Sequence, residues 1–165
     1  MSANPPHRLA LRVIPRGARE RPSKIFCGHC GRAPETRAAK SRVCPTCGLG
    51  LLLEASVDVA PSPRDPFLVI DSTLMVCAVS REAERLLGVS ETDAVNHHVG
   101  DFLSPGDSES GADSLITALA LTTQHDAPIK NLVVRPTNTF GVRYWARIGR
   151  CGPPSAALLV LADAR

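Results

Sequence analysis

Four cysteines in the first third of the chain have the spacing of a metal site. Cys27 and Cys30 form one pair, CGHCG, and Cys44 and Cys47 form the second, CPTCG, in the overall pattern C-x2-C-x13-C-x2-C. Two thiolates this close in sequence can reach one ion only from a tight backbone knuckle, which the glycine after each pair permits. Two knuckles supply the four thiolates that structural zinc favours. The sequence therefore predicts a structural Zn²⁺ site whose positions are all filled by protein ligands.

The segment between the pairs indicates what the metal would do. Residues 32–43, RAPETRAAKSRV, cannot form an apolar core, so the bound ion would supply the free energy that folds this region. Iron in a similar tetrathiolate site is chemically possible. Disulfides or a redox switch are less expected, because no secretory signal is visible. His29, inside the first knuckle, is expected to be a solvated loop residue and not a ligand.

The cysteine segment resembles a zinc ribbon of the rubredoxin-like kind over residues 25–57, with LGLLLEASV (49–57) as its closing strand. Before it, residues 1–24 are expected to form a basic flexible arm. After it, residues 58–66, DVAPSPRDP, predict a proline-rich linker that separates the core of the ribbon from that of the remaining chain.

Charge is distributed unevenly along the chain. Residues 1–50 carry ten Lys or Arg against two Glu, a formal charge of +8, whereas residues 51–165 carry nine against fourteen Asp or Glu, or −5. A basic surface favours phosphate through counterion release, although it can also be a merely solvated face. The candidate nucleic-acid contacts are the arginines of the arm: Arg8, Arg12, Arg16, Arg19 and Arg21. Phe26 is the only aromatic residue among residues 1–50, and this scarcity disfavours the stacking of nucleic-acid bases.

From residue 67 the pattern changes to strands and helices. Apolar runs predict strands at 67–71, 75–80, 129–136, 142–149 and 156–163. Capping residues and helical spacing predict helices at 80–88, 91–103 and 113–124. The strands at the two ends must meet in one antiparallel sheet whose helices cover one face. The predicted fold class is α+β, a five-stranded antiparallel sheet with helices on one face, plus the small N-terminal zinc ribbon.

Several stretches of this region resemble a PAS domain. FLVID runs into a second strand, SREAERLLG matches the family's short helix, and VGDFLSPGD matches the helix that closes with a turn. The resemblance covers about residues 64–165. Ser80 stands where many PAS domains carry Asn, and serine caps a helix equally well. The resemblance implies a sensor of a small molecule, redox state or light, or a dimerisation module, so a homodimer is one expectation.

The resemblance also implies an interior pocket, which side chains fill or an apolar ligand occupies. Its candidate lining residues are Val69, Met75, Cys77, Leu87, His98, Phe102, Leu119 and Trp145. The sequence does not identify the ligand. Haem is an alternative, with His98 as its candidate ligand, but a half-buried, hydrogen-bonded histidine is the simpler interpretation. A flavin photosensor is not expected, because the predicted helix 91–103 contains no cysteine.

Two further cysteines lie outside the ribbon. Cys77, in LMVCAVS, is expected to be a small buried side chain of a strand. Cys151, in RCGPPS, is expected to lie in a turn. The sequence leaves open whether either thiol is reactive.

No motif of an enzyme is present, because G-x-S-x-G, a phosphate loop and H-E-x-x-H are all missing from the sequence. We expect a non-enzymatic, bacterial-type signalling or regulatory protein in the cytoplasm, with no membrane span. Its zinc ribbon would be coupled to a PAS sensor or dimerisation domain and would act on protein partners. The alternatives are a nucleic-acid-binding transcriptional regulator that uses the arm and ribbon, and a sensor of haem or an apolar metabolite.

Overall fold

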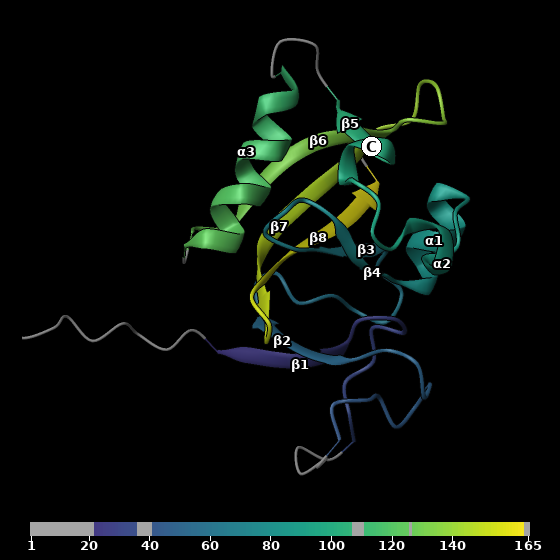
Figure 1. The fold of residues 1–165 in the computed structure, drawn as a ribbon, viewed down its shortest axis with the longest axis vertical. Helices are drawn as coiled ribbons and strands as arrows, with labels where there is room; N and C mark the ends of the chain where they lie inside the picture. The colour runs from purple at the N-terminus through teal and green to yellow at the C-terminus, as the bar shows by residue number, and fades with distance from the viewer. Residues whose placement is uncertain (1–21, 36–40, 107–110, 126, 164–165) are drawn as a thin grey trace, which may run out of the picture.

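The predicted strands and helices occur in the expected order, but the sheet has eight strands where five were predicted, because Ser23–Cys27, Leu52–Ser56 and Leu103–Pro105 also join it (Figure 1). The computed structural model describes residues 22–35, 41–106, 111–125 and 127–163. The strands are β1 (Ser23–Cys27), β2 (Leu52–Ser56), β3 (Phe67–Ile70), β4 (Val76–Val79), β5 (Leu103–Pro105), β6 (Lys130–Pro136), β7 (Tyr144–Gly152) and β8 (Ala156–Asp163). The helices are α1 (Arg81–Leu87), α2 (Glu91–Ala94), a 3₁₀ turn (Val99–Asp101) and α3 (Gly111–Gln124).

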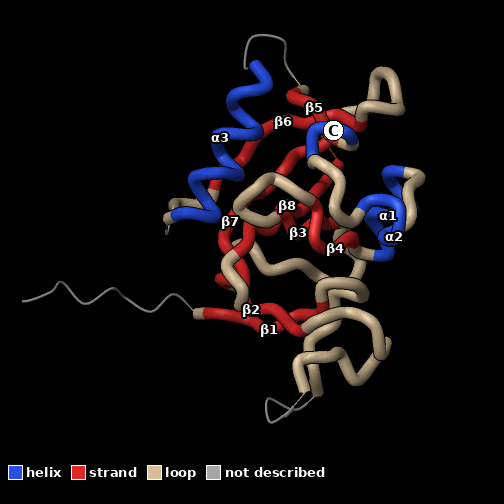
Figure 2. The backbone as a smooth tube through the Cα atoms, viewed as in Figure 1, coloured by secondary structure: helices blue, strands red, loops and turns tan. Residues whose placement is uncertain are grey.

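The strands of the described residues join one antiparallel sheet (Figure 2). Its main path is β1-β2-β7-β8-β3-β4, with β6 paired to β7 and β5 to β6. Strand β3 pairs with β8, which confirms that the strands at the two ends of the 67–163 region meet. Strand β2 pairs with the end of β7, through Glu54 with Gly152 and Ala55 with Cys151. The ribbon's closing strand is therefore part of the main sheet.

Each face of the sheet has its own apolar core. Leu68, Leu159 and Leu161 belong to one cluster, together with Leu87 of α1 and Leu119 of α3. Because side chains alternate along strands, their neighbours project to the opposite face. A second cluster forms there: Phe26, Leu53, Ala55, Val59, Phe67, Val69, Cys151, Ala156, Leu158 and Val160. The helices thus pack on one core, and β1 and β2 on the other.

This second core corrects the expectation that residues 58–66 separate two independent cores. Val59, within the predicted linker, is buried among residues of both β2 and β8. The backbone N–H groups of Val59 and Ala60 both donate to Ser56 O, at 3.0 and 2.8 Å, which turns the chain back onto the sheet. The sequence did not predict this packing, because the prolines that follow Val59 are typical of a linker.

The predicted helix over 91–103 is also wrong. Ser90 caps the helix as predicted, since its Oγ accepts from Asp93 N, but α2 ends at Ala94. Asn96 then takes a positive φ of 66°, and its N–H donates to Val76 O at 2.9 Å. Hydrogen bonds to β4 therefore replace those of a continued helix.

Among the described residues, no helix has the length and apolar character needed to span a bilayer.

Candidate metal centre

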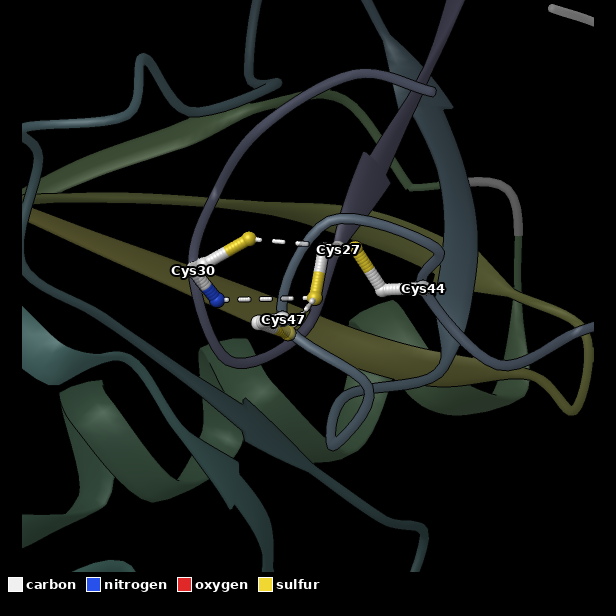
Figure 3. A group of neighbouring side chains, drawn as sticks. All are labelled: Cys27, Cys30, Cys44 and Cys47. Carbon is white, nitrogen blue, oxygen red and sulfur yellow. Dashed lines mark hydrogen bonds between the residues drawn. The ribbon is translucent and has the colours of Figure 1, made fainter. Parts of the chain in front are cut away.

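The four cysteines of the ribbon converge on one point (Figure 3). All four sulfur atoms lie within 4.8 Å of one another. The Cys27 and Cys47 sulfurs are 3.6 Å apart, and those of Cys30 and Cys44 are 3.9 Å apart. A tetrahedron with Zn–S bonds of about 2.3 Å has edges of about 3.8 Å. The sulfur positions therefore fit a tetrahedral tetrathiolate ion such as Zn²⁺.

Both pairs fold as the expected knuckles. Gly31 N donates to Cys27 O and Gly48 N to Cys44 O, each at 2.9 Å, so each knuckle closes on the glycine that follows it. The φ angles of Gly31 and Gly48 are 70° and 69°, values that favour glycine. The N–H groups of His29 and Cys30 point at the Cys27 sulfur at 3.4 Å. Such donors stabilise a metal-bound thiolate.

The thiols differ in acidity because their surroundings differ. Burial raises the pKa values of the Cys27 and Cys30 thiols. Burial also opposes ionisation of Cys47, but hydrogen bonds from the backbone N–H groups of Gly50 and Leu49 and from the Cys27 and Cys30 thiols together lower its pKa to about 6. A metal must therefore displace protons from Cys27 and Cys30, so acid opposes binding at this site.

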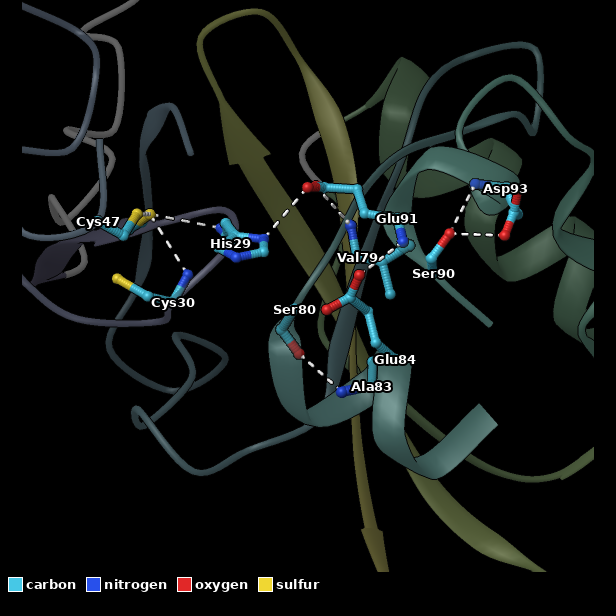
Figure 4. A network of polar contacts seen from close by, with 11 residues as sticks. His29, Cys30, Cys47, Val79, Ser80, Ala83, Glu84, Ser90, Glu91 and Asp93 are labelled. Atoms are coloured by element: carbon cyan, nitrogen blue, oxygen red, sulfur yellow. Dashed lines mark hydrogen bonds and ion pairs between the residues drawn. The ribbon is translucent and has the colours of Figure 1, made fainter. Parts of the chain in front are cut away.

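His29 connects the first knuckle to the rest of the protein (Figure 4). It is 7% exposed, which corrects the expectation of a solvated loop residue. Its Nδ1 lies 3.1 Å from Glu91 Oε2, and Glu91 Oε1 accepts from Val79 N at 3.2 Å. The carbonyl of His29 accepts from Arg81 N at 3.0 Å, next to the Ser80 cap of α1. Glu91 is 62 residues away in sequence, and no local pattern points to it as a partner.

Removing the His29–Glu91 contact is expected to weaken the attachment of the ribbon without removing its metal. His29→Ala and Glu91→Gln should each lower the free energy of unfolding by about 1 kcal/mol, since each leaves a partly buried polar partner unmatched. The double variant should lose less than the sum of the two. Urea unfolding measures the three losses, and zinc content should stay unchanged. Strictly additive losses would show that the contact contributes nothing.

The eight residues predicted to line an interior pocket do not line a single one, although Val69 and Cys77 both border a pocket on the face away from the helices. Leu87 and Leu119 belong to the core under the helices, with Phe102 packed against it. Val69 lies in the opposite core. Trp145 is 49% exposed. Met75 and His98 form an isolated bridge between their backbones, and His98 Nδ1 accepts from Gly100 N at 3.0 Å. That bond caps the 3₁₀ turn, so it gives His98 a structural role, and the alternative of a haem ligand stays a prediction.

The predicted environments of Cys77 and Cys151 are both wrong. Cys77 is exposed, and Cys151 is buried inside β7. The reason is an irregularity in β4: Val69 pairs with Ala78 and Ile70 with Val76, which leaves Cys77 unpaired on the face away from the helices. Although Cys77 is an exposed residue, partial desolvation of its sulfur and the charge of Asp71 raise its pKa, and burial raises the pKa of Cys151 to about 12.

We expect iodoacetamide to modify Cys77 in the folded, zinc-loaded protein and to leave Cys151 intact. Only the thiolate reacts. Because the pKa of Cys77 is raised, its rate should still increase with pH above the usual thiol value of about 8.5. Peptide mass spectrometry over a pH series measures both rates. Equal modification of Cys151 would show that its strand opens readily.

The arm arginines Arg8, Arg12, Arg16, Arg19 and Arg21 lie outside the described residues. The structure therefore leaves the nucleic-acid alternative as a prediction from charge.

No protein-family model matches the chain, and no curated protein matches it in sequence. Among solved structures, it is similar to the PAS domain of an HTR-like protein from Haloarcula marismortui, at 16% identity and a TM-score of 0.47, with 60% of this chain and 80% of that chain covered. It is also similar to the PAS domain of nitrogen regulation protein NR(II) from Vibrio parahaemolyticus, at 14% identity and a TM-score of 0.45, with 66% of this chain and 99% of that chain covered.

Proposed function

We propose that the chain is a non-enzymatic regulatory protein, in which a structural zinc ribbon is joined to a PAS-like domain that senses a signal or binds a protein partner. The observation that carries this proposal is the direct attachment of the tetracysteine centre to the sheet. Strand β2 pairs with β7, and His29 of the first knuckle contacts Glu91 of α2. A conformational change in the ribbon can therefore alter α2, and a change in α2 can alter the ribbon.

A structural role for the metal follows from its ligands. Four cysteines complete a tetrahedron and leave no position for substrate or water. Cys27 and Cys44 are buried, so solvent has little access to the centre. The ion would hold the knuckles in the shape that packs on the sheet, and it would not take part in a reaction.

The ribbon also presents apolar side chains to solvent, which supports a protein partner. Val43, Leu49 and Leu51, around the second knuckle, are 43%, 69% and 49% exposed. Exposed apolar groups that cluster in this way are typical of protein contacts. By contrast Phe26, which is the only aromatic residue among residues 1–50, is fully buried and cannot stack on a base. These two facts favour a protein partner over single-stranded nucleic acid.

Native mass spectrometry of the freshly purified chain tests the metal and the oligomeric state together. We expect one Zn²⁺ per chain. A metal-free spectrum with reduced sulfurs would overturn the zinc centre, and iron would change the identity of the ion. A photo-reactive amino acid at Val43 then tests the partner in cells. We expect one protein to be captured in the zinc-loaded state and lost after Cys44→Ser, with Leu121 as the control position.

A salt series tests the nucleic-acid alternative. If the arm contacts phosphate, duplex affinity should fall steeply with salt and should collapse when the five arm arginines become alanine. If no affinity exists even at low salt, this alternative fails, and the protein-partner proposal stands.

A further inference from the structure

A pocket lies between the ribbon and the sheet, on the face away from the helices. Its volume is about 230 Å³. Its apolar wall is formed by Leu49, Leu51 and Leu53 of the ribbon and by Val69, Ala78 and Ala156 of the sheet. An engineered apolar cavity of about 150 Å³ holds benzene. The pocket is therefore large enough for a compact six-membered ring with one substituent.

The charged groups of the pocket are acidic. Asp71 and Glu91 both line it, and none of its described lining residues is basic. Asp71 Oδ1 accepts from Thr73 N, Thr73 Oγ1 and Met75 N at 2.7, 2.7 and 3.1 Å, which fixes the carboxylate. Although burial opposes ionisation, the hydrogen bonds from Thr73 and Met75 lower its pKa, so Asp71 is charged at neutral pH. The lining thus combines an apolar wall with negative charge.

We propose that this pocket binds a small apolar molecule that carries a protonated amine. The hydrocarbon body would lie against the leucines of the ribbon and Val69 and Ala78 of the sheet. The ammonium group would lie near Asp71 and Glu91. A carboxylate of the same shape would be repelled, and a neutral analogue would lose the charge attraction. The occupant committed to here is a free small amine and not a protein side chain.

The position of the pocket would tie its occupancy to the metal-held ribbon. Gly28 of the first knuckle and Gly50 beside the second both line it. Glu91, on the same wall, also contacts His29. This inference deepens the proposed function by naming the class of signal. It rests on the proposed function in one respect: it requires the two knuckles to hold their metal ion.

Three ligands of nearly equal shape test the proposal: cyclohexylamine, cyclohexanol and cyclohexanecarboxylate. Each is titrated into the zinc-loaded full chain with ¹³C-labelled methyl groups. We expect cyclohexylamine to bind with a Kd of about a millimolar or tighter and to shift the methyl signals of Leu51, Leu53, Val69 and Ala78. Cyclohexanol should bind about threefold to fivefold more weakly, and the carboxylate should not bind.

Two variants and one wild-type measurement sharpen the test. Asp71→Asn preserves an oxygen that can accept the three hydrogen bonds, and it should remove most of the preference for the amine over the alcohol. Cys77 also lines the pocket, so Cys77→Phe should fill it and abolish binding. Val57→Ala, at a 46% exposed site that does not line the pocket, should change nothing. In the wild-type protein, cyclohexylamine should slow the modification of Cys77 by iodoacetamide.

Three results would overturn the inference: shifts spread over the surface, equal binding of amine and carboxylate, or unprotected Cys77 at saturating amine. Zinc content is measured in each sample. A sample with one Zn²⁺ and no binding refutes the pocket alone, whereas a sample that never holds zinc refutes the proposed function first.

Discussion

Replacing Cys44 by serine is expected to remove the metal and to lower the melting temperature of the entire protein. Structural zinc contributes roughly 10–16 kcal/mol of apparent binding free energy in small ribbons. Without it the knuckles should unfold, and β1 and β2 should lose their support. The second core would then lose Phe26 and Leu53, which pack there with residues of β3 and β8. We expect a fall in melting temperature of about 10 °C or more, measured by calorimetry together with zinc content.

Cys77→Ser is the matched control for this experiment. It also removes one thiol, but from an exposed position outside the metal site. It should retain one Zn²⁺ and melt within about 2 °C of the wild-type protein. If Cys44→Ser lost its zinc but melted like the control, the ribbon and the sheet would be independent units, and the packing of the second core would be wrong.

Truncation of Phe26 is expected to have the largest effect of any single apolar substitution in the ribbon. Its side chain is fully buried, and its ring meets that of Phe67 edge-on, with centroids 5.6 Å apart and planes at 88°. The pair joins β1 to β3 across the second core. Phe26→Ala should lower the free energy of unfolding by about 3–5 kcal/mol, measured by urea denaturation.

Phe140→Ala provides the comparison, because Phe140 is fully exposed. It should change the free energy of unfolding by less than about 0.5 kcal/mol. A similar small change for Phe26→Ala would show that the edge-to-face contact does not hold ribbon and sheet together. A changed denaturant slope for Phe26→Ala would instead indicate that the ribbon unfolds in a separate step.

The local parts of this structure could be predicted from sequence, because their determinants lie within a few residues. The knuckles need only Cys-x2-Cys followed by glycine, and the sulfurs converge as expected. Strands β3 and β8 follow apolar runs, and α1 begins at the predicted cap, where Ser80 Oγ accepts from Ala83 N. These features are decided by backbone conformation and short-range hydrogen bonds.

The parts that join distant segments could not be predicted in this way. The pairing of Glu54 with Gly152 and the contact of His29 with Glu91 depend on surfaces that exist only after folding. The same cause explains why the helix predicted over 91–103 does not form. Val95, His98 and Phe102 have helical spacing, but Asn96 N donates to Val76 O of β4, and His97 O accepts from Val76 N. Tertiary contacts override a local pattern when they satisfy the same backbone groups.

The pairing of β2 with β7 also has a consequence for synthesis on the ribosome. Both cysteine pairs lie before residue 48, so the knuckles can take up metal soon after they leave the exit tunnel. The partner of Glu54, however, is Gly152. At about 5–20 residues per second, the intervening stretch of about 100 residues takes about 5–20 s to translate. During that interval the ribbon has an unpaired strand edge, and apolar residues such as Phe26 lack the partners that bury them. If the proposed Zn²⁺ binds first, we therefore expect nascent chains to aggregate most readily after the knuckles have folded around it and before β7 is made.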